Sequence, residues 1–323
     1  MKKLFLSLVA MMVATVSYSQ NTTVATLSHG GEITMYYGLN ALREAHEAAE
    51  SGDIISLSGG TFNSVNITKA ITLRGAGIDR VTPTFIVNEF EINVTDTETA
   101  HLSVEGIRCA SRITMLGSFS NASFLKCQFN TFWVRSENIK DMLFVDCKIT
   151  NRYQHIWGTH TVQFVNCYVA DFQNSGCSAS FVNCVNIMGQ FPNSQLTNCI
   201  IYNPTDSEIK LNSSSLAQNC VIIGNNNSSF LSNSTISTGC KTATYAETFK
   251  SFTGTYTDDQ TFELTDNAKT KFLGTDGKQV GMYGGMMPFN TTTSYPQITK
   301  LNVANKTTAD GKLSVEIEVS AGQ

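Results

Sequence analysis

The chain has the sequence FLKCQF at residues 124–129, FVDCKI at 144–149 and FVNCYV at 164–169. The same pattern continues as FVNC at 181–184, LTNCII at 196–201 and NCVII at 219–223. If Cys177 is left out, the cysteines from Cys109 to Cys240 follow one another at intervals of 15 to 21 residues. A period near 20 residues indicates a repeat architecture, in which each repeat is one structural unit stacked on the next.

These repeats are too short for pairs of helices, and their apolar residues alternate with polar ones. Phe, Val and Ile predominate, which favours strands. Strands that recur at this period without helices between them predict a parallel β-solenoid, with coils stacked about 4.8 Å apart. We expect the cysteines to form an interior column. The asparagines that precede four of them should form a second ladder: Asn166, Asn183, Asn198 and Asn219.

The nine cysteines are expected to be buried free thiols, because Cys behaves in a core as a small apolar residue. Disulfides are a weaker alternative, since stacked side chains with parallel Cβ directions do not suit the bond. A metal site is weaker still. The chain has no C-x₂-C pair, and the nearest two cysteines that could cooperate, Cys177 and Cys184, lie seven residues apart.

The amino-acid composition favours β-structure and argues against one class of partner. Of the 323 residues, 41% are hydrophobic, so a core can form, but only 15% are charged and 27 are Asn. Soluble domains usually have about 25% charged residues. A polar, uncharged composition suits β-structure with ladders of hydrogen-bonding side chains. The net charge of −4 argues against nucleic acid as a partner.

The chain divides into five parts. Residues 1–19 have the basic start, apolar centre and small-residue end of a signal peptide, so we expect an exported protein of net charge −6 without a membrane span. Residues 20–52 include a helix over 40–50 that would cap the solenoid. Residues 53–245 would form nine or ten coils, 246–290 a closing segment, and 291–323 a β-hairpin extension with its turn at Asp310 and Gly311.

On these features the chain resembles the right-handed parallel β-helix proteins of the pectin-lyase-like superfamily. The opening region 41–77, the Phe-x-x-Cys coils and the glycine-rich stretch 275–285 carry the resemblance, which covers residues 39–290. The chain is most similar to exported β-helix proteins of Bacteroidetes. The resemblance implies the fold, but not an activity, because this fold carries enzymes and non-enzymes alike.

Polysaccharide lyases on this fold use a Lys or Arg base, often with Ca²⁺ held by carboxylates. The chain lacks the Trp-x-Asp-His and Arg-x-Pro-x-x-Arg motifs of pectate lyases. It also lacks the full polygalacturonase set, of which only Asp258-Asp259 is present. Hydrolysis of a glycosidic bond needs two carboxylates, and the coils from 172 to 240 have only Asp206 and Glu208.

The remaining charged and aromatic residues gather in the middle coils, where they could form a glycan groove. The candidates for substrate binding are Trp133, Arg135, Tyr153, His155 and Trp157. Lys148 and Arg152 are candidate catalytic residues, as base and carboxylate clamp. Asp141, Asp146 and Asp171 are candidate calcium ligands; no other cofactor is indicated. Because Cys147 should face inward, Asp146 and Lys148 should point outward.

Three functions fit the sequence. The favoured one is an exported protein that engages a polysaccharide or other glycan along a solenoid face without catalysis. The second is a β-eliminating polysaccharide lyase that uses the Lys148 and Arg152 region, with or without calcium. The third is a structural or adhesive surface protein that binds another macromolecule through its long Asn, Ser and Thr face. The alternative without a binding site is that these middle-coil residues are ordinary solvated surface, with Trp133 or Trp157 in the core. The sequence leaves the oligomeric state open.

Overall fold

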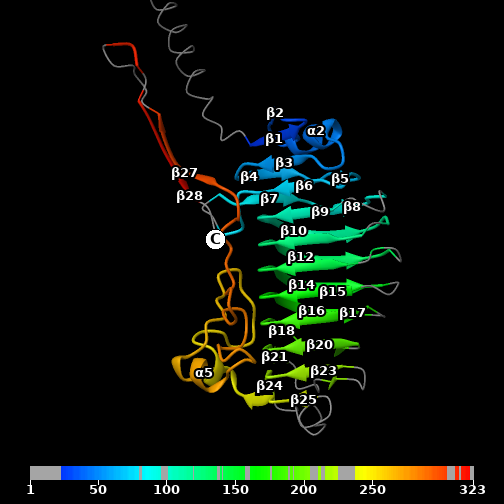
Figure 1. Cartoon of the computed structure of the whole chain (residues 1–323), viewed down its shortest axis with the longest axis vertical. Coiled ribbons are helices and arrows are strands. Elements are labelled where there is room, and N and C mark those ends of the chain that lie inside the picture. The colour runs from blue at the N-terminus through cyan, green and yellow to red at the C-terminus, as the bar shows by residue number, and fades with distance from the viewer. Residues whose placement is uncertain are drawn as a thin grey trace, which may run out of the picture.

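A computed structural model describes residues 23–79, 82–95, 101–118, 120–136, 139, 141–156, 161–174, 177–187, 190–191, 193–203, 210–211, 215–224, 237–303, 310–312 and 314–320. The predicted signal peptide lies outside these residues. The described chain is mostly β-structure wound into a β-solenoid, seen as a stack of strands in Figure 1. Its regular part, from β9 to β24, has about seven turns. This is fewer than the nine or ten coils expected; shorter or less regular strands extend both sheets at either end.

The first sheet holds one strand of each coil and ends in an antiparallel pair at the N-terminal side. In spatial order its strands are β2 (Glu32–Tyr37), β1 (Val24–His29), β3 (Ile54–Leu57), β6 (Thr72–Arg74), β9 (Leu102–Glu105), β11 (Ala122–Leu125), β13 (Met142–Val145), β15 (Thr161–Val165), β17 (Ser178–Val182), β20 (Ser194–Thr197), β23 (Leu216–Gln218) and β25 (Ser237–Thr238). From β3 onward neighbouring strands are parallel.

The second sheet is parallel and takes the next strand of each coil. Its strands are β26 (Lys241–Ala243), β24 (Val221–Ile223), β21 (Ile200–Tyr202), β18 (Val185–Ile187), β16 (Tyr168–Asn174), β14 (Lys148–His155), β12 (Gln128–Val134), β10 (Ile107–Met115), β7 (Thr84–Val87) and β4 (Gly60–Asn63), with β8 (Phe90–Ile92) and β5 (Asn66–Ile67) beside them. Two small pairs complete the strands: β19 (Gln190–Phe191) with β22 (Lys210–Leu211), and β27 (Gln297–Val303) with β28 (Val315–Ser320).

Among the described residues the helices are α2 (Ala41–Ala48), α4 (Tyr245–Thr248) and α5 (Asp266–Lys271). The helix expected over 40–50 is therefore present as α2, which lies beside β1 and β2 at the N-terminal end (Figure 1). Asn40 occupies its N-cap position, but its side chain does not cap the helix. It accepts a hydrogen bond of 2.8 Å from Nδ2 of Asn63 instead. None of these helices is long and apolar enough to cross a membrane.

The core is built from rows of equivalent residues in successive coils. Phe124, Phe144, Phe164 and Phe181 face one another in register on the first sheet, with ring centroids 4.9 Å apart at each step. This distance matches the spacing of hydrogen-bonded strands, so the stacking of the rings follows from the stacking of the coils. All four rings are fully buried. Alternation along each strand places them inside, as the sequence pattern predicts.

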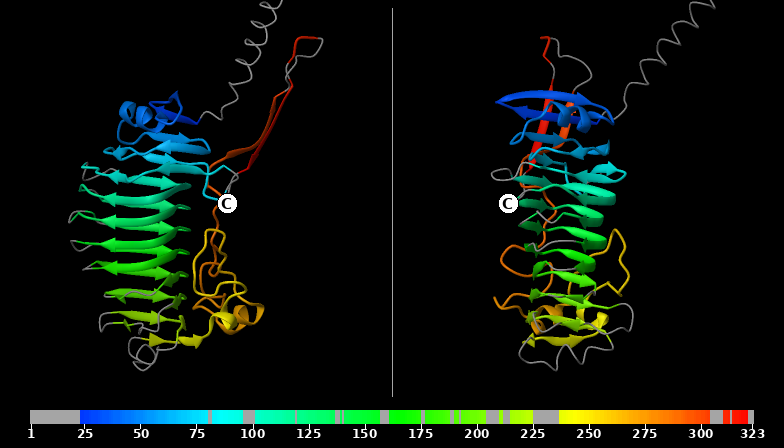
Figure 2. Two further views of the ribbon diagram at one scale, coloured as in Figure 1. Left: turned by 180° about the vertical axis from the view of Figure 1, so that it is seen from behind. Right: turned by 90° about the vertical axis from the view of Figure 1, so that its right-hand side faces the viewer.

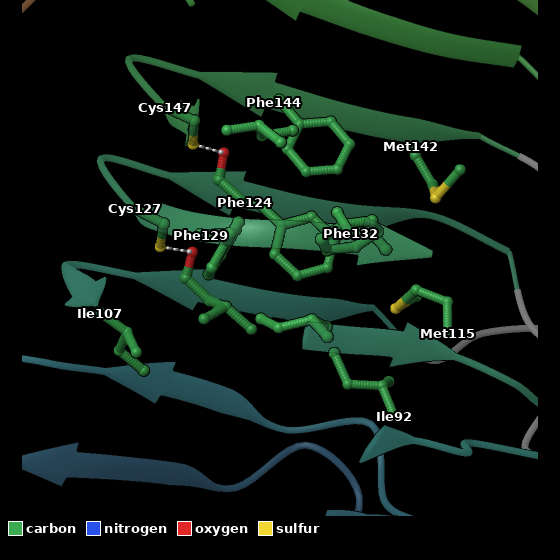
Figure 3. Packing of buried hydrophobic residues seen from close by; sticks show 14 of the residues in the cluster. Ile92, Ile107, Met115, Phe124, Cys127, Phe129, Phe132, Met142, Phe144 and Cys147 are labelled. Atoms are coloured by element: carbon green, nitrogen blue, oxygen red, sulfur yellow. Dashed lines mark hydrogen bonds between the residues drawn. The ribbon is translucent and has the colours of Figure 1, made fainter. Parts of the chain in front are cut away.

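All nine cysteines are free, and seven of them form the predicted row at one corner of the solenoid: Cys127, Cys147, Cys167, Cys184, Cys199, Cys220 and Cys240. Cys109, expected at the start of the column, pairs with Phe129 two residues past the corner, and Cys177 lies just before β17. Figure 3 shows Cys127 and Cys147 one above the other, beside Phe124, Phe132 and Phe144. The Cys147 thiol donates to the carbonyl oxygens of Phe124, 3.2 Å away in the preceding coil, and of Val145, at 3.3 Å. The corner therefore suits Cys because it is small and apolar and still offers a weak donor. Burial raises the pKa of the Cys127, Cys147 and Cys167 thiols.

The residue before each of these cysteines has a left-handed backbone conformation, which turns the chain from the first sheet into the second. Asn is one of the few residues other than Gly that adopts this conformation readily. The row consists of Lys126, Asp146, Asn166, Asn183, Asn198 and Asn219, with φ between 51° and 57°, and of Gly239 before Cys240, with φ 66°. The predicted asparagine ladder therefore exists, but the turn geometry explains it.

Residues 273–295, here called the strap, run back along this row from the last coils toward the first (Figures 1 and 2). The strap bonds to one coil after another, and its polar contacts include Asn219 Nδ2 to Leu273 O (3.3 Å), Thr275 N to Asn198 Oδ1 (2.9 Å), Asn166 Nδ2 to Met287 O (2.6 Å), Lys126 Nζ to Thr292 O, and Ser294 N to Glu105 Oε1 (2.6 Å). The asparagine side chains thus bond chiefly to the strap.

A second apolar cluster lies outside the solenoid, between the second sheet and residues 243–282. Its centre is Tyr168, whose ring lies 4.8 Å from that of Tyr256 and 4.7 Å from that of Phe262. The cluster joins outward-facing residues of β16 to β24 with residues of the C-terminal region: Val185, Ile200, Tyr202, Val221 and Ile223 with Phe249, Phe252, Leu264, Phe272 and Val280. One outer face of the second sheet is therefore covered by the chain itself. The hairpin of β27 and β28 projects away from the solenoid (Figure 2).

Candidate functional site

The outer face of β10, β12, β14 and β16 carries a row of half-buried polar and aromatic side chains. We call it the Trp133 strip and define it as Arg112, Trp133, Arg152, Gln154, Asp171 and Gln173. Backbone register aligns the strip: Trp133 pairs with Gln154 and Gln154 with Gln173, while Arg152 pairs with Asp171. The strip faces outward because the residues between its members, Phe132, Tyr153 and Phe172, are buried in the core.

Trp133 is the centre of the strip. The guanidinium carbon of Arg112 lies 4.2 Å from the centroid of its ring, a cation–π contact that covers one face of the ring. Glu89 fixes Arg112 in turn, because Oε1 accepts a hydrogen bond of 2.5 Å from Arg112 Nε. Nε1 of Trp133 is buried and has no hydrogen-bond partner among the described residues. An indole N–H is a donor only, so this atom is an unused donor beneath the strip.

Arg152 and Asp171 form the charged end of the strip. Arg152 Nε donates to Asp171 Oδ2 over 2.8 Å, and Gln173 Nε2 donates to the same oxygen over 2.9 Å. The two charged side chains are 40% and 33% exposed, so their ion pair adds little stability. Exposed and weakly held, they are available to hydrogen-bond a ligand. An aromatic ring between such groups is the usual composition of a sugar-binding surface.

The other predicted substrate-binding residues are elsewhere. Tyr153 is fully buried, with its ring 5.3 Å from that of Phe172, and His155 is buried at the end of the same strand. The structure therefore does not bring either residue to the strip. Arg135 is exposed just beyond β12. Trp157 lies outside the described residues.

The two predicted catalytic residues are both on β14, Lys148 as its first residue and Arg152 near its middle. Arg152 belongs to the strip, whereas Lys148 points outward as expected but is buried beneath the C-terminal region. Lys148 Nζ lies 4.0 Å from Asp79 Oδ1 and 5.7 Å from the ring centroid of Phe289. Arg108 and Gln128 stand beside Lys148 in the same outward column, and both donate to Asp258. Lys148 thus belongs to a separate charged cluster.

The three predicted calcium ligands do not converge. Asp141 and Asp146 flank the two ends of β13, and Asp171 lies on the other sheet in its pair with Arg152. Asp146 is held at the strap, where Asn166 Nδ2 donates to it over 3.3 Å, and burial raises its pKa to about 6. Within the described residues no three His, Cys, Asp or Glu side chains gather as a metal site requires. These carboxylates do not fit a common calcium ion.

Sequence reasoning missed Arg112, although it stands in the same outward row as Arg152. Each of β10, β12 and β14 has a register irregularity just after the cysteine corner. Arg112 and Arg152 each follow the corner residue of their coil, Ile107 and Cys147, by five residues. The coil of Arg112 has Ile107 in place of the corner cysteine, and Cys109 lies two residues further along, so the cysteine pattern does not reveal the equivalence.

Comparisons of the chain with family models, with curated proteins and with solved structures find no match.

Proposed function

We propose that this protein binds polysaccharide along the Trp133 strip without acting on it chemically. The observation that supports the proposal is the alignment of one tryptophan with arginine, glutamine and carboxylate side chains on adjacent parallel strands. Adjacent strands are about 4.8 Å apart, so the four strands of the strip span about 14 Å. Repeated hydrogen-bonding groups at this spacing suit an extended chain of repeating polar units.

The test is a binding assay of the mature protein against a panel of neutral and acidic polysaccharides. An aromatic contact contributes about 0.5–1.5 kcal/mol beyond its buried area, so Trp133→Ala should weaken binding by about two- to tenfold. Gln195→Ala, on the outer face of the first sheet, serves as the matched control. Binding by Trp133→Ala that equals the wild type, or no binding to any member of the panel, would refute the proposal.

A β-eliminating polysaccharide lyase, with or without calcium, is the second candidate. The observation in its favour is the charged cluster of Lys148, Arg108, Asp79 and Asp258, where cationic and carboxylate groups converge. The strip lacks such a cluster, since its charges form only the pair of Arg152 and Asp171 and the contact of Arg112 with Glu89. Unsaturated uronate absorbs in the ultraviolet, so rising absorbance on uronate polysaccharides, lost in Lys148→Ala, would establish this activity. A flat trace with Ca²⁺ and with chelator would exclude it for those substrates.

An adhesive or structural role is the third candidate. It is supported by a column of uncharged outward positions on the first sheet: Ser123, Leu143, Gln163, Ser180, Gln195 and Leu216. A column of outward positions without charge suits contact with another macromolecule more than acid–base chemistry. Gln163→Glu with Gln195→Glu should weaken such a contact and leave binding at the strip unchanged.

The same proposal places the protein outside the cytoplasm, in the periplasm, at the cell surface or in the medium. The supporting observation is the signal-like sequence of residues 1–19. The proposal also includes right-handed winding of the solenoid, a capping role for α2, and kinship with pectin-lyase-like β-helix proteins. Fractionation of expressing cells tests the location. Accumulation of the uncleaved chain in the cytoplasm would contradict it.

A further inference from the structure

A small pocket lies on the outer face of the first sheet, where β9, β11 and β13 begin. Its volume is about 220 Å³, and His101, Asn121, Ser123, Asp141 and Gln163 contribute its polar lining. Pockets for drug-sized ligands are usually 300–1,000 Å³, so this one would hold only a small chemical group. Asp141 is its one charged lining residue apart from the titratable His101. A neutral group would enter more readily than an anion.

Ser123 and His101 meet in this pocket. Oγ of Ser123 lies 3.0 Å from Nε2 of His101, within the range at which an imidazole removes the proton of a nucleophilic hydroxyl. The two residues come from adjacent strands, because Ser123 pairs with Ser103 and His101 stands just before β9. Ser103 Oγ lies 3.2 Å from Ser123 Oγ. In this arrangement Ser123 Oγ donates to Ser103 Oγ, and rotation of the Ser123 hydroxyl would direct its proton to Nε2 of His101 instead.

The pocket also has donors that a hydrolytic reaction needs. Attack on an ester carbonyl places negative charge on the carbonyl oxygen, which side-chain amides can stabilise. Asn121, just before β11, and Gln163, two strands away in the outward column of Ser123, both line the pocket and carry amide donors. The lining thus combines a nucleophile, a base and two amide groups.

We propose that Ser123 and His101 form a hydrolytic site for small, uncharged acyl esters. Ser123 Oγ forms a bond to the acyl carbon as its proton passes to Nε2 of His101. The bond from that carbon to the alcohol oxygen then breaks, and the leaving alcohol takes the proton from His101. Water then attacks the acyl carbon and gives a proton to Nε2 of His101. The bond from that carbon to Ser123 Oγ breaks, Oγ takes the proton from His101, and the carboxylic acid leaves. The site is separate from the Trp133 strip, and its activity does not depend on polysaccharide binding.

The test uses p-nitrophenyl acetate with the full mature chain. General-base catalysis is worth about 10²- to 10⁴-fold, so Ser123→Ala and His101→Ala should each lower hydrolysis at least about 100-fold toward the buffer rate. Ser180→Ala is the matched control, because Ser180 occupies the same outward column two coils beyond Leu143. The Ser180→Ala variant should hydrolyse the ester at the wild-type rate. Circular dichroism of each variant verifies the fold.

A second measurement separates this site from simple imidazole chemistry, because an exposed histidine alone hydrolyses activated esters. A fluorophosphonate probe should label Ser123 in the wild type, as read by peptide mass spectrometry, and should not label it in His101→Ala. Loss of hydrolysis in His101→Ala but not in Ser123→Ala would overturn the proposal. So would absent labelling of Ser123, or a wild-type rate equal to that of buffer.

Discussion

Asn198 offers the sharpest test of how the strap is held. Its side chain accepts a hydrogen bond of 2.9 Å from Thr275 N and donates one of 3.3 Å to Thr275 Oγ1. Its backbone φ is +57°, and the residue is only 4% exposed. Asn198 therefore performs two tasks, the left-handed turn and the attachment of the strap. Substitution by Gly removes only the attachment, whereas substitution by Ala removes the attachment and strains the turn.

The magnitudes follow from these two tasks. Two buried hydrogen bonds contribute about 0.5–1.5 kcal/mol each, so Asn198→Gly should lower the free energy of unfolding by about 1–3 kcal/mol. Gly lowers the free energy of unfolding by a further amount of about 0.4–1 kcal/mol, because it raises the entropy of the unfolded chain. Asn198→Ala avoids this entropic loss, but the left-handed conformation costs the Ala residue about 1–2 kcal/mol. We therefore expect both variants to be destabilised and Ala to be the worse by about 0–1.6 kcal/mol.

Urea unfolding measures these differences, and limited proteolysis shows where they act. Cleavage should begin within residues 273–295 in both variants before the coils are cut. Asn203→Ala is a control, because Asn203 is a nearby buried asparagine outside the left-handed row. If Asn198→Ala were as stable as the wild type, or more stable than Asn198→Gly, the account of the turn would be refuted.

Three further predictions concern the core, the corner and the thiols. Phe144→Ala should lower the free energy of unfolding by about 3–5 kcal/mol in a denaturant titration, because the ring is fully buried between Phe124 and Phe164; a loss under 1 kcal/mol would contradict the packing. Burial raises the pKa of Asp146 from 3.8 to about 6, so its contribution to stability is full below about pH 4 and is lost as the pH rises through about 6. Asp146→Asn should therefore melt higher than the wild type at pH 8 and not at pH 4; equal melting curves at both would exclude this linkage. A thiol reagent should modify Cys240, the one half-buried cysteine, before the other eight, which should react only after denaturation; rapid labelling of Cys147 would argue against a closed core.

The sequence predicted the coils because stacking imposes one residue type on one position. Phe144 and Cys147 recur with their neighbours at a steady period, and the period survives in the structure as rows of rings and thiols. Side-chain direction was less predictable past the cysteine corner. The register irregularity there differs by one residue between neighbouring coils, and in β14 it places Tyr153 and His155 in the core and Arg152 outside.

The covering of the second sheet could also not be located from its own sequence, because residues 246–295 have no period. A signal existed in the coils themselves. Ile200-Ile201-Tyr202 and Val221-Ile222-Ile223 are unbroken apolar runs, and a strand buried on one face only would alternate. These runs indicate that both faces of the second sheet are buried here. They do not indicate which segment of the chain covers the outer face.

The strap changes how such a molecule should fold. In a simple solenoid each coil contacts only its neighbours, so coils can form and melt nearly independently. Here residues 273–294 bond to coils from Asn219 back to Glu105, and Tyr295 contacts Gly75 across 220 residues of sequence. Contacts of such long range slow folding and link distant coils into one cooperative unit. The outer face of the second sheet therefore stays uncovered until residues 243–282 have been synthesised. During synthesis or export the coils form first, and the C-terminal region covers them in a late step.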